Sequence, residues 1–300
     1  MNENTLRIGV IGLGDIARKA YLPVLATDPS LELQLCTRNP ATLAEIGDAY
    51  RIEHRYRDVD QLLAAGIDAA FVHTATSSHV EVVSALLDAG VPTYVDKPLA
   101  GDLDGSTMLV EKARAAGCSL MVGFNRRYAP VYRALADVAW SVVVMQKNRV
   151  RSADEVRRVV FDDFIHIVDT LRFLARGAQL RDVDALVVDG LLQQLTVTLV
   201  GGGTTAIGLM NRDGGLVEEV LEVHGPGLKR RVTDLADAVE HAVGIESVTR
   251  RGDWTAVERQ RGFAAICAEF LDGVRAGRVF DADDALRTHQ VCEQIVAAIG

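Results

Sequence analysis

The sequence predicts two domains: an α/β domain in residues 1–123, with a parallel sheet covered by helices, and an α+β domain in residues 124–300, with a mostly antiparallel open sheet. Three observations lead to this prediction. Short apolar runs alternate with helical stretches up to about residue 122, which is typical of a parallel sheet with both faces covered. A glycine-rich turn separates the first apolar run from the first helix. Long strands with alternating polarity appear only later in the chain.

The strands and helices of the first half are predicted from this alternation and from glycines that come directly after helical stretches. Gly66, Gly90 and Gly117 each follow a helical stretch, the position at which glycine ends a helix most easily. The expected strands are residues 7–11, 31–36, 69–73, 93–95 and 120–122, and the expected helices are residues 16–26, 40–50, 79–89 and 103–116.

The second half is rich in strands. Leu195, Val197 and Leu199 alternate with threonines, which predicts a hairpin with one buried face and excludes a membrane span there. No low-complexity linker separates the halves, so the boundary is expected near Gly123. The expected strands are residues 140–146, 185–188, 191–199, 204–210, 216–224 and 229–233, and the expected helices are residues 161–174, 263–276 and 283–299.

Composition bounds the class of protein. With 300 residues, 49% of them apolar and 24% charged, the chain is long enough for two ordinary globular domains. The net charge of −9 gives no electrostatic reason to expect nucleic acid or an anionic membrane as a partner. The four cysteines form no CxxC and lie in apolar contexts, so we expect reduced core thiols and a cytoplasmic protein.

The glycine-rich turn carries the first functional signal. Gly12, Gly14 and Ala17 fit the pattern G-x-G-x-x-A between a strand and a helix. In that context the glycines allow a tight turn and a close approach to a pyrophosphate, so the turn indicates a dinucleotide-binding Rossmann domain. The alternative is a structural turn without a ligand. The contacts expected from this loop are Gly12, Leu13, Gly14, Asp15 and Ile16.

The end of the second strand bears on the choice of dinucleotide. An acidic residue there would bind the 2′-hydroxyl of NAD, but Glu32 stands at the start of the strand, too early to reach it. Thr37 and Arg38 can instead bind and neutralise a 2′-phosphate. The sequence therefore favours NADP(H), with NAD(H) possible; the alternative for Arg38 is a solvated surface arginine.

Three further segments carry a family resemblance, at residues 71–79, 96–100 and 123–128. Together with the glycine loop they resemble the Gfo/Idh/MocA oxidoreductase family, most closely its MviM-type branch. The resemblance implies a Rossmann domain and an NAD(P)-dependent oxidoreductase acting on a hydroxyl or carbonyl of a small polar, sugar-like molecule. It also implies a homodimer formed through the open face of the C-terminal sheet.

The same resemblance assigns further cofactor contacts. Asp96-Lys97-Pro98 stands where the family has Glu-Lys-Pro, and the family places this lysine beside the nicotinamide. The polar loop at residues 74–76 replaces the usual Thr-Pro-Asn. The alternatives are a surface lysine at Lys97 and a helix-start residue at His79. The contacts so implied are Thr74, Ala75, Thr76, His79, Asp96, Lys97 and Asn125.

A polar group interrupts an otherwise apolar helix at residues 162–169. Asp162 and His166 are spaced i, i+4 and share one face. With Asp169 they match the family motif D-x-G-x-H-x-x-D, which implies catalytic and substrate-binding roles for Asp162 and His166 beside catalytic Lys97. Phe164 stands where glycine is usual and could fill space that a sugar would occupy. The alternatives are a core histidine and a metal site; no metal is expected.

Arg126 is expected to bind substrate. Either Arg126 or Arg127 could hold a substrate carboxylate or phosphate, or form an interdomain ion pair with one of the many acids. Two other functions remain open from the sequence: a redox-assisted NAD-dependent glycoside hydrolase, which shows no net cofactor turnover, and a nonenzymatic NADP-binding regulatory protein.

Overall fold

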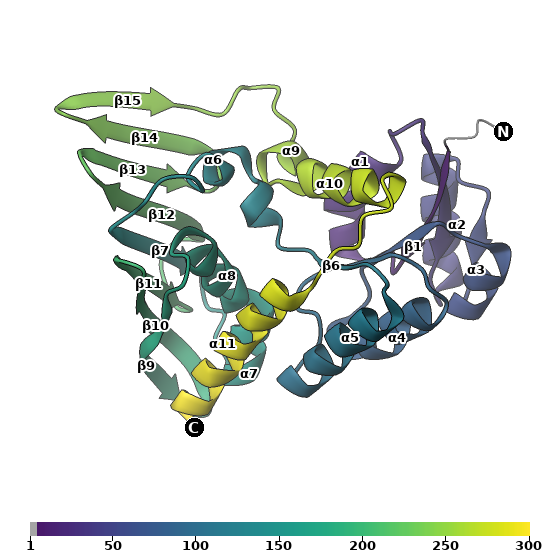
Figure 1. Cartoon of the computed structure of the whole chain (residues 1–300), viewed down its shortest axis with the longest axis horizontal. Helices are drawn as coiled ribbons and strands as arrows, with labels where there is room; N and C mark the ends of the chain where they lie inside the picture. Colours follow the sequence, from purple (N-terminus) through teal and green to yellow (C-terminus); the bar gives the residue numbers. More distant parts are fainter. Residues whose placement is uncertain (1–4) are drawn as a thin grey trace. The chain divides into compact units, whose positions relative to one another are not determined.

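The computed structural model describes residues 5–300, which form two compact units (Figure 1). The first unit contains the chain up to Gly123 together with Phe263–Leu286, and the second contains Phe124–Gly262 with Arg287–Gly300. The sequence analysis placed the segment Phe263–Leu286 with the second domain. That expectation is corrected, because the apolar side chains of this segment pack in the first unit.

The first unit is built on a parallel sheet of six strands in the order β3-β2-β1-β4-β5-β6, the arrangement typical of Rossmann folds. All its strand pairs are parallel, as the sequence predicted. The strands are β1 Leu6–Ile11, β2 Leu31–Cys36, β3 Arg55–Tyr56, β4 Ala69–Val72, β5 Thr93–Val95 and β6 Leu120–Val122.

The helices of this unit begin and end largely where the sequence placed them. The exception is the predicted helix at residues 16–26. It is a π-helix followed by a short α-helix with Pro23 in its first turn, where the missing proline N–H leaves no bond unmade. The helices are η1 Ala17–Tyr21, α1 Leu22–Leu25, α2 Pro40–Tyr50, α3 Val59–Ala65, η2 Thr76–Ser78, α4 His79–Asp88, α5 Leu103–Ala116 and α10 Phe263–Arg275.

Aromatic contacts explain why α10 belongs to the first unit. The ring of Phe270 lies 5.2 Å from that of Phe71 and 5.7 Å from that of Tyr94, centroid to centroid. Phe263 packs edge-on against Tyr21 at 5.2 Å. After the helix, the carbonyl of Phe280 accepts a hydrogen bond from the β6 strand. The late segment thus completes the apolar cover of the early sheet.

The second unit is built on a sheet of nine strands, antiparallel except for the pair β7 and β11. The sequence predicted a mostly antiparallel sheet but not β8, β14 and β15, and the strand that it predicted at residues 185–188 is shorter than β9. The strands are β7 Val142–Asn148, β8 Asp154–Glu155, β9 Gln179–Val188, β10 Leu191–Gly201, β11 Thr204–Asn211, β12 Glu218–Gly225, β13 Leu228–Thr233, β14 Asp237–Ala242 and β15 Ile245–Thr249.

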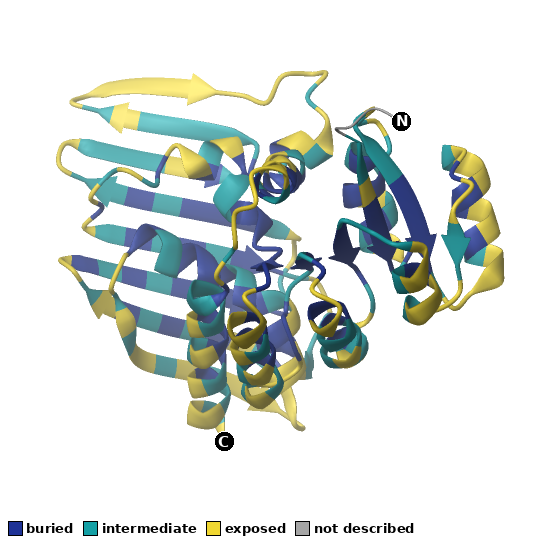
Figure 2. Cartoon of the chain, turned by 45° about the vertical axis from the view of Figure 1, so that its right-hand side comes forward, coloured by how far each residue is buried: buried dark blue, intermediate teal, exposed yellow. Residues whose placement is uncertain are grey.

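The continuous helical stretch from Val156 to Leu174 covers one face of this sheet. It packs so closely that a Cβ atom at Gly208 of β11 would lie 2.5 Å from Ile167 Cγ2. Figure 2 shows the resulting bands of buried and partly exposed residues across the middle strands. The helices of the unit are η3 Asn125–Tyr128, α6 Pro130–Arg133, α7 Val156–Val159, η4 Val160–Phe164, α8 Ile165–Leu174 and α9 Val257–Gln260; α11 Asp283–Ile299 joins this unit from Arg287 onward.

Candidate active site

The glycine loop has the backbone that the motif requires. Gly12 has a φ of +87°, and a Cβ atom there would lie 2.6 Å from the Thr74 nitrogen and 2.7 Å from the His73 carbonyl, so no other residue fits. A Cβ at Gly14 would meet nothing within 4 Å. The loop is therefore packed tightly on β4 at its first glycine and open to a ligand at its second.

A pocket of about 620 Å³ lies directly against this loop. Its lining includes seven of the residues that the sequence assigned to the cofactor: Gly12, Leu13, Gly14, Thr37, Arg38, Thr74 and Ala75. Asp15, Ile16, Thr76, His79, Asp96 and Lys97 belong to the same unit but do not line this pocket. The sequence analysis missed Arg57, Asp58 and Asp60, which follow β3 and line the pocket near Arg38.

Among residues 5–300, three buried atoms in this lining lack a hydrogen-bond partner: both ring nitrogens of His73 and the hydroxyl oxygen of Thr74. The Thr74 hydroxyl oxygen is buried and makes no hydrogen bond with any residue between 5 and 300. Buried polar atoms are normally satisfied, so a hydroxyl in the wall of a pocket indicates a ligand that reaches it. The pocket volume, the open side of Gly14 and this hydroxyl together fit a bound dinucleotide.

His79 holds the pocket wall in place. The ring is buried, with Nδ1 2.8 Å from the carbonyl of Pro98 and Nε2 3.1 Å from the carbonyl of Thr74. It therefore joins the loop after β4 to the loop after β5. This is a positioning role, and the expected direct contact of His79 with the cofactor stays a prediction.

Asp96 and Lys97 follow β5 at the carboxyl edge of the sheet, where α/β folds bind ligands. The Asp96 carboxylate accepts a hydrogen bond from the Lys97 amide at 2.9 Å and one from the Tyr21 hydroxyl at 3.4 Å. Burial raises the pKa of Asp96, although the charge of Lys97 opposes the shift. Tyr21 in turn lies 2.8 Å from the Tyr94 hydroxyl, so a buried network fixes the residue before Lys97.

The second unit carries the predicted acid–base residues on the helical stretch α7–η4–α8. Asp162 is exposed, His166 is partly exposed, and Phe164 between them is fully buried. The carboxylate of Asp162 lies 3.8 Å from Arg158 Nε. The Phe164 ring therefore packs as a core side chain, while Asp162 and His166 reach the surface of the helix.

Asp169, the last acid of the motif, has a different environment. It is buried and accepts two hydrogen bonds from Arg127, at 2.5 and 2.8 Å, and one from the Thr288 hydroxyl at 3.2 Å. Asn125, an expected cofactor contact, donates its amide to the Arg261 carbonyl at 2.8 Å. Within the second unit both side chains tie segments of the chain together.

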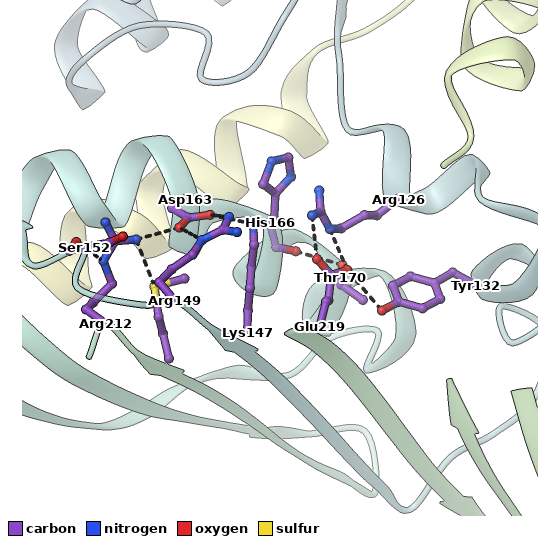
Figure 3. Close-up of polar contacts among 11 residues, drawn as sticks. Arg126, Tyr132, Lys147, Arg149, Ser152, Asp163, His166, Thr170, Arg212 and Glu219 are labelled. Carbon is purple, nitrogen blue, oxygen red and sulfur yellow. Dashed lines mark hydrogen bonds and ion pairs between the residues drawn. The ribbon is translucent and has the colours of Figure 1, made fainter. Parts of the chain in front are cut away.

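The carboxylate of Asp163, next to Asp162, binds three cations (Figure 3). Lys147 Nζ lies at 2.5 Å, Arg149 binds both oxygens at 2.7 and 2.8 Å, and Arg212 approaches at 2.6 Å. Burial disfavours the ionised carboxyl, but the bonds from Arg149 and the charge of Lys147 outweigh it and hold the pKa of Asp163 far below its ordinary range. The sequence analysis missed Asp163 and its partners.

Arg126, the predicted substrate-binding residue, is buried beside this group. It binds both oxygens of Glu219, at 2.6 and 2.9 Å, and the Tyr132 hydroxyl adds a bond at 3.2 Å. Burial alone would raise the pKa of Glu219, yet Arg126 lowers it to about 2. Arg126 is thus engaged in an ion pair inside the second unit, whereas the alternative to substrate binding was an interdomain pair.

Lys147 should give the stability of the protein a distinct pH dependence. Burial, helped by Arg126 and Arg149 and opposed by Asp163 and Glu219, lowers its pKa from 10.5 to about 7. Between these two values the unfolded chain binds more protons than the folded chain, so the free energy of unfolding rises with pH. Urea unfolding from pH 7 to 10 should show wild type gaining stability relative to Lys147→Met; parallel curves would contradict the shift.

Comparison with known proteins agrees with this geometry. Residues 6–124 match a family described as an oxidoreductase family with an NAD-binding Rossmann fold, Gfo/Idh/MocA, and residues 127–242 match the YceM-like C-terminal domain. A protein of Salmonella typhimurium named YceM is 37% identical over 283 residues, covering 90% of each chain. The chain belongs to the Gfo/Idh/MocA family.

Two further similar proteins extend the comparison for this Gfo/Idh/MocA chain. The myo-inositol dehydrogenase Hyg17 of Streptomyces leeuwenhoekii is 35% identical over 200 residues, which cover 62% of this chain and 59% of Hyg17. A solved dehydrogenase from Clostridium difficile, MviM, superposes with a TM-score of 0.92 at 29% identity, covering 98% of this chain and 99% of that one. The protein is therefore an oxidoreductase with a dinucleotide-binding fold, and its resemblance to the MviM-type branch is confirmed.

None of the helices in residues 5–300 is both long enough and apolar enough to cross a membrane. Within the same residues, histidine, cysteine and acidic side chains form no group of three or more that could hold a metal ion. All four cysteines are buried and unbonded.

Proposed function

We propose that this enzyme transfers a hydride between NADP(H) and a carbon that bears a hydroxyl or carbonyl group in a small, sugar-like molecule. The observation that supports this most is the pocket beside Gly14, with Arg38 in its lining and the Thr74 hydroxyl unpartnered. Relatives such as Hyg17, which is named for an inositol substrate, support a polyol as the substrate class.

The proposed hydride and proton transfers involve the nicotinamide and three side chains, those of His166, Lys97 and Asp162. A bound nicotinamide supplies or takes up the hydride. A ring nitrogen of His166 removes the hydroxyl proton during oxidation and returns it during reduction, the task for which histidine is best suited near neutral pH. The Lys97 ammonium donates a hydrogen bond to the reacting oxygen. Asp162, exposed one helical turn before His166, orients the imidazole or binds a neighbouring hydroxyl.

The preference for NADP(H) rests on Arg38. In a fluorescence titration NADPH should bind more tightly than NADH, and Arg38→Ala should weaken NADPH binding by roughly tenfold to a hundredfold while leaving NADH unchanged, because charged hydrogen bonds contribute about 1.5–3 kcal/mol. Arg133→Ala, an exposed arginine of the second unit, is the matched control. Tighter binding of NADH, or equal weakening of both nucleotides, would contradict the assignment.

A homodimer is proposed through the uncovered face of the second sheet. Val144 and Ile207 are paired on β7 and β11 and lie only partly buried on that face. Asp182 of β9 lies toward one side of this face and carries a negative charge. Arg231 of β13 lies toward the other side and carries a positive charge. A twofold axis along the strands would bring the acidic side of one copy over the basic side of the other.

The dimer has a direct test. Sedimentation should give twice the chain mass for wild type and a monomer for Ile207→Glu, because a buried carboxylate at the centre of the face has no partner. Met108→Glu, on the surface of α5, is the control and should remain dimeric. A monomeric wild type would overturn the proposal. The four unbonded thiols support a reducing, cytoplasmic location.

A further inference from the structure

The buried polar group of the second unit has more positive than negative charge. Its cations come from η3, from β7 and from the segments that follow β7 and β11, and its anions come from η4 and β12. The four cations are Arg126, Lys147, Arg149 and Arg212, and the two anions are Asp163 and Glu219. We call these six residues the Lys147 cluster. With Lys147 protonated, the surplus of the cluster is two positive charges.

Neighbouring acids do not cancel this surplus. Glu218 lies on the opposite face of β12 from Glu219, where it accepts the amide of Asn148 at 2.8 Å. Asp162 and Asp154 share Arg158, at 3.8 and 3.3 Å, on the solvent side of the helix, where water screens them. Lys147, by contrast, has a side chain only 4% exposed, so its charge is poorly screened.

Figure 3 shows how the cluster is arranged. Lys147 rises from β7 and is drawn between Arg149 and Arg126, and His166 follows Asp163 by three residues on the same helical stretch. Arg149 and Arg126 each use Nε and Nη2 on their carboxylates, and within residues 5–300 neither Nη1 makes a bond to another side chain or carbonyl. The Nη1 groups of Arg149 and Arg126 can therefore donate hydrogen bonds to a ligand on either side of Lys147.

We infer that the Lys147 cluster is the subsite for an anionic group on the substrate, a carboxylate or a phosphate ester carried by a polyol. This inference rests on the proposed function and names its substrate class: a sugar acid or sugar phosphate rather than a neutral sugar. A bound anion would cancel buried positive charge that otherwise has no counterion, and low local polarity would strengthen the attraction.

One other observation supports the subsite. The lowered pKa of Lys147 reflects its burial and the positive charge of Arg126, which an incoming anion would offset. Because the whole chain carries a net charge of −9, which repels an anionic substrate at long range, binding of such a substrate requires a local positive cluster.

The test compares polyols that differ only in the anionic group. Calorimetry measures binding of D-gluconate, D-galactonate and D-glucitol 6-phosphate against the neutral D-glucitol and galactitol, with and without saturating NADP⁺. For wild type at least one anionic probe should bind about 30-fold or more tightly than its neutral counterpart, as expected for a desolvated charge pair. The preferred probe distinguishes a carboxylate from a phosphate.

Lys147→Met should abolish that preference while leaving neutral polyol binding within about threefold of wild type. The variant should fold, because Asp163 keeps Arg149 and Arg212. Lys112→Met, which removes a surface lysine paired with Asp88, is the matched control. No preference for an anion in any pair, or a preference that survives Lys147→Met, would overturn the inference. Binding is measured without turnover, so failure of hydride transfer would be seen separately.

Discussion

The His166→Asn variant is expected to lose about 10²–10⁴-fold in kcat, the range attributed to a general acid–base residue. Asparagine keeps a polar side chain of similar size but cannot take up the hydroxyl proton. Binding of NADPH, measured by fluorescence, should be unchanged, since His166 belongs to the second unit and the nucleotide pocket to the first. The loss should therefore appear in kcat and not in cofactor affinity.

A matched control is available in the first unit. His54 is exposed and contacts only Glu32, at 3.5 Å, among the ion pairs formed by residues 5–300. His54→Asn should keep the wild-type kcat. The assay uses whichever inositol, sugar or sugar acid wild type oxidises with net reduction of NADP⁺. If His166→Asn turns over as fast as wild type, His166 does not transfer the proton.

Asp163→Asn should be the most destabilising single change in the Lys147 cluster. It removes the charge that three buried or half-buried cations share, and breaking such a group typically costs about 3–5 kcal/mol. Urea unfolding at pH 6, where Lys147 is charged, should show this loss in the free energy of unfolding.

The neighbouring residue provides the comparison. Asp162→Asn changes the same chemical group one residue earlier, but its side chain is 48% exposed and its pair with Arg158 is long. Its cost should stay below about 1 kcal/mol. Equal stability of the two variants would show that the cations around residue 163 do not depend on its charge.

The sequence alone was enough to predict the strands that are covered on both faces of the first sheet. β4 is apolar throughout and β1 is apolar after Arg7, because both faces of this sheet are covered, and such runs are visible without a partner. β14 and β15 were missed for the opposite reason. Residues Ile245–Thr249 are exposed along their whole length, so the strand is defined by backbone pairing with β14 and shows no apolar pattern.

The residues of the candidate site also differ in whether a local sequence pattern predicts them. Gly12 and Gly14 lie in one short motif, and the sequence identified them. Asp163 is held by residues from β7 and from the end of β11, and no local pattern reveals pairing over such distances. One signal was available. Lys147 continues the alternation of Val143 and Met145, which places a lysine on the buried face of its strand. A buried charge is destabilising unless it is paired, so this position indicates a partner of opposite charge.

The membership of α10 in the first unit has a consequence for how the chain is made. The chain leaves the Rossmann unit after Gly123 and supplies the remaining part of it only with Phe263–Leu286. During synthesis the rings of Phe71 and Tyr94 therefore lack their contacts with Phe270 until the ribosome has added residues 124–262 of the second unit and the helix α10 that follows them. A fragment that stops at residue 123 would expose that aromatic surface to other chains, so the two units cannot be separated by truncation at one point.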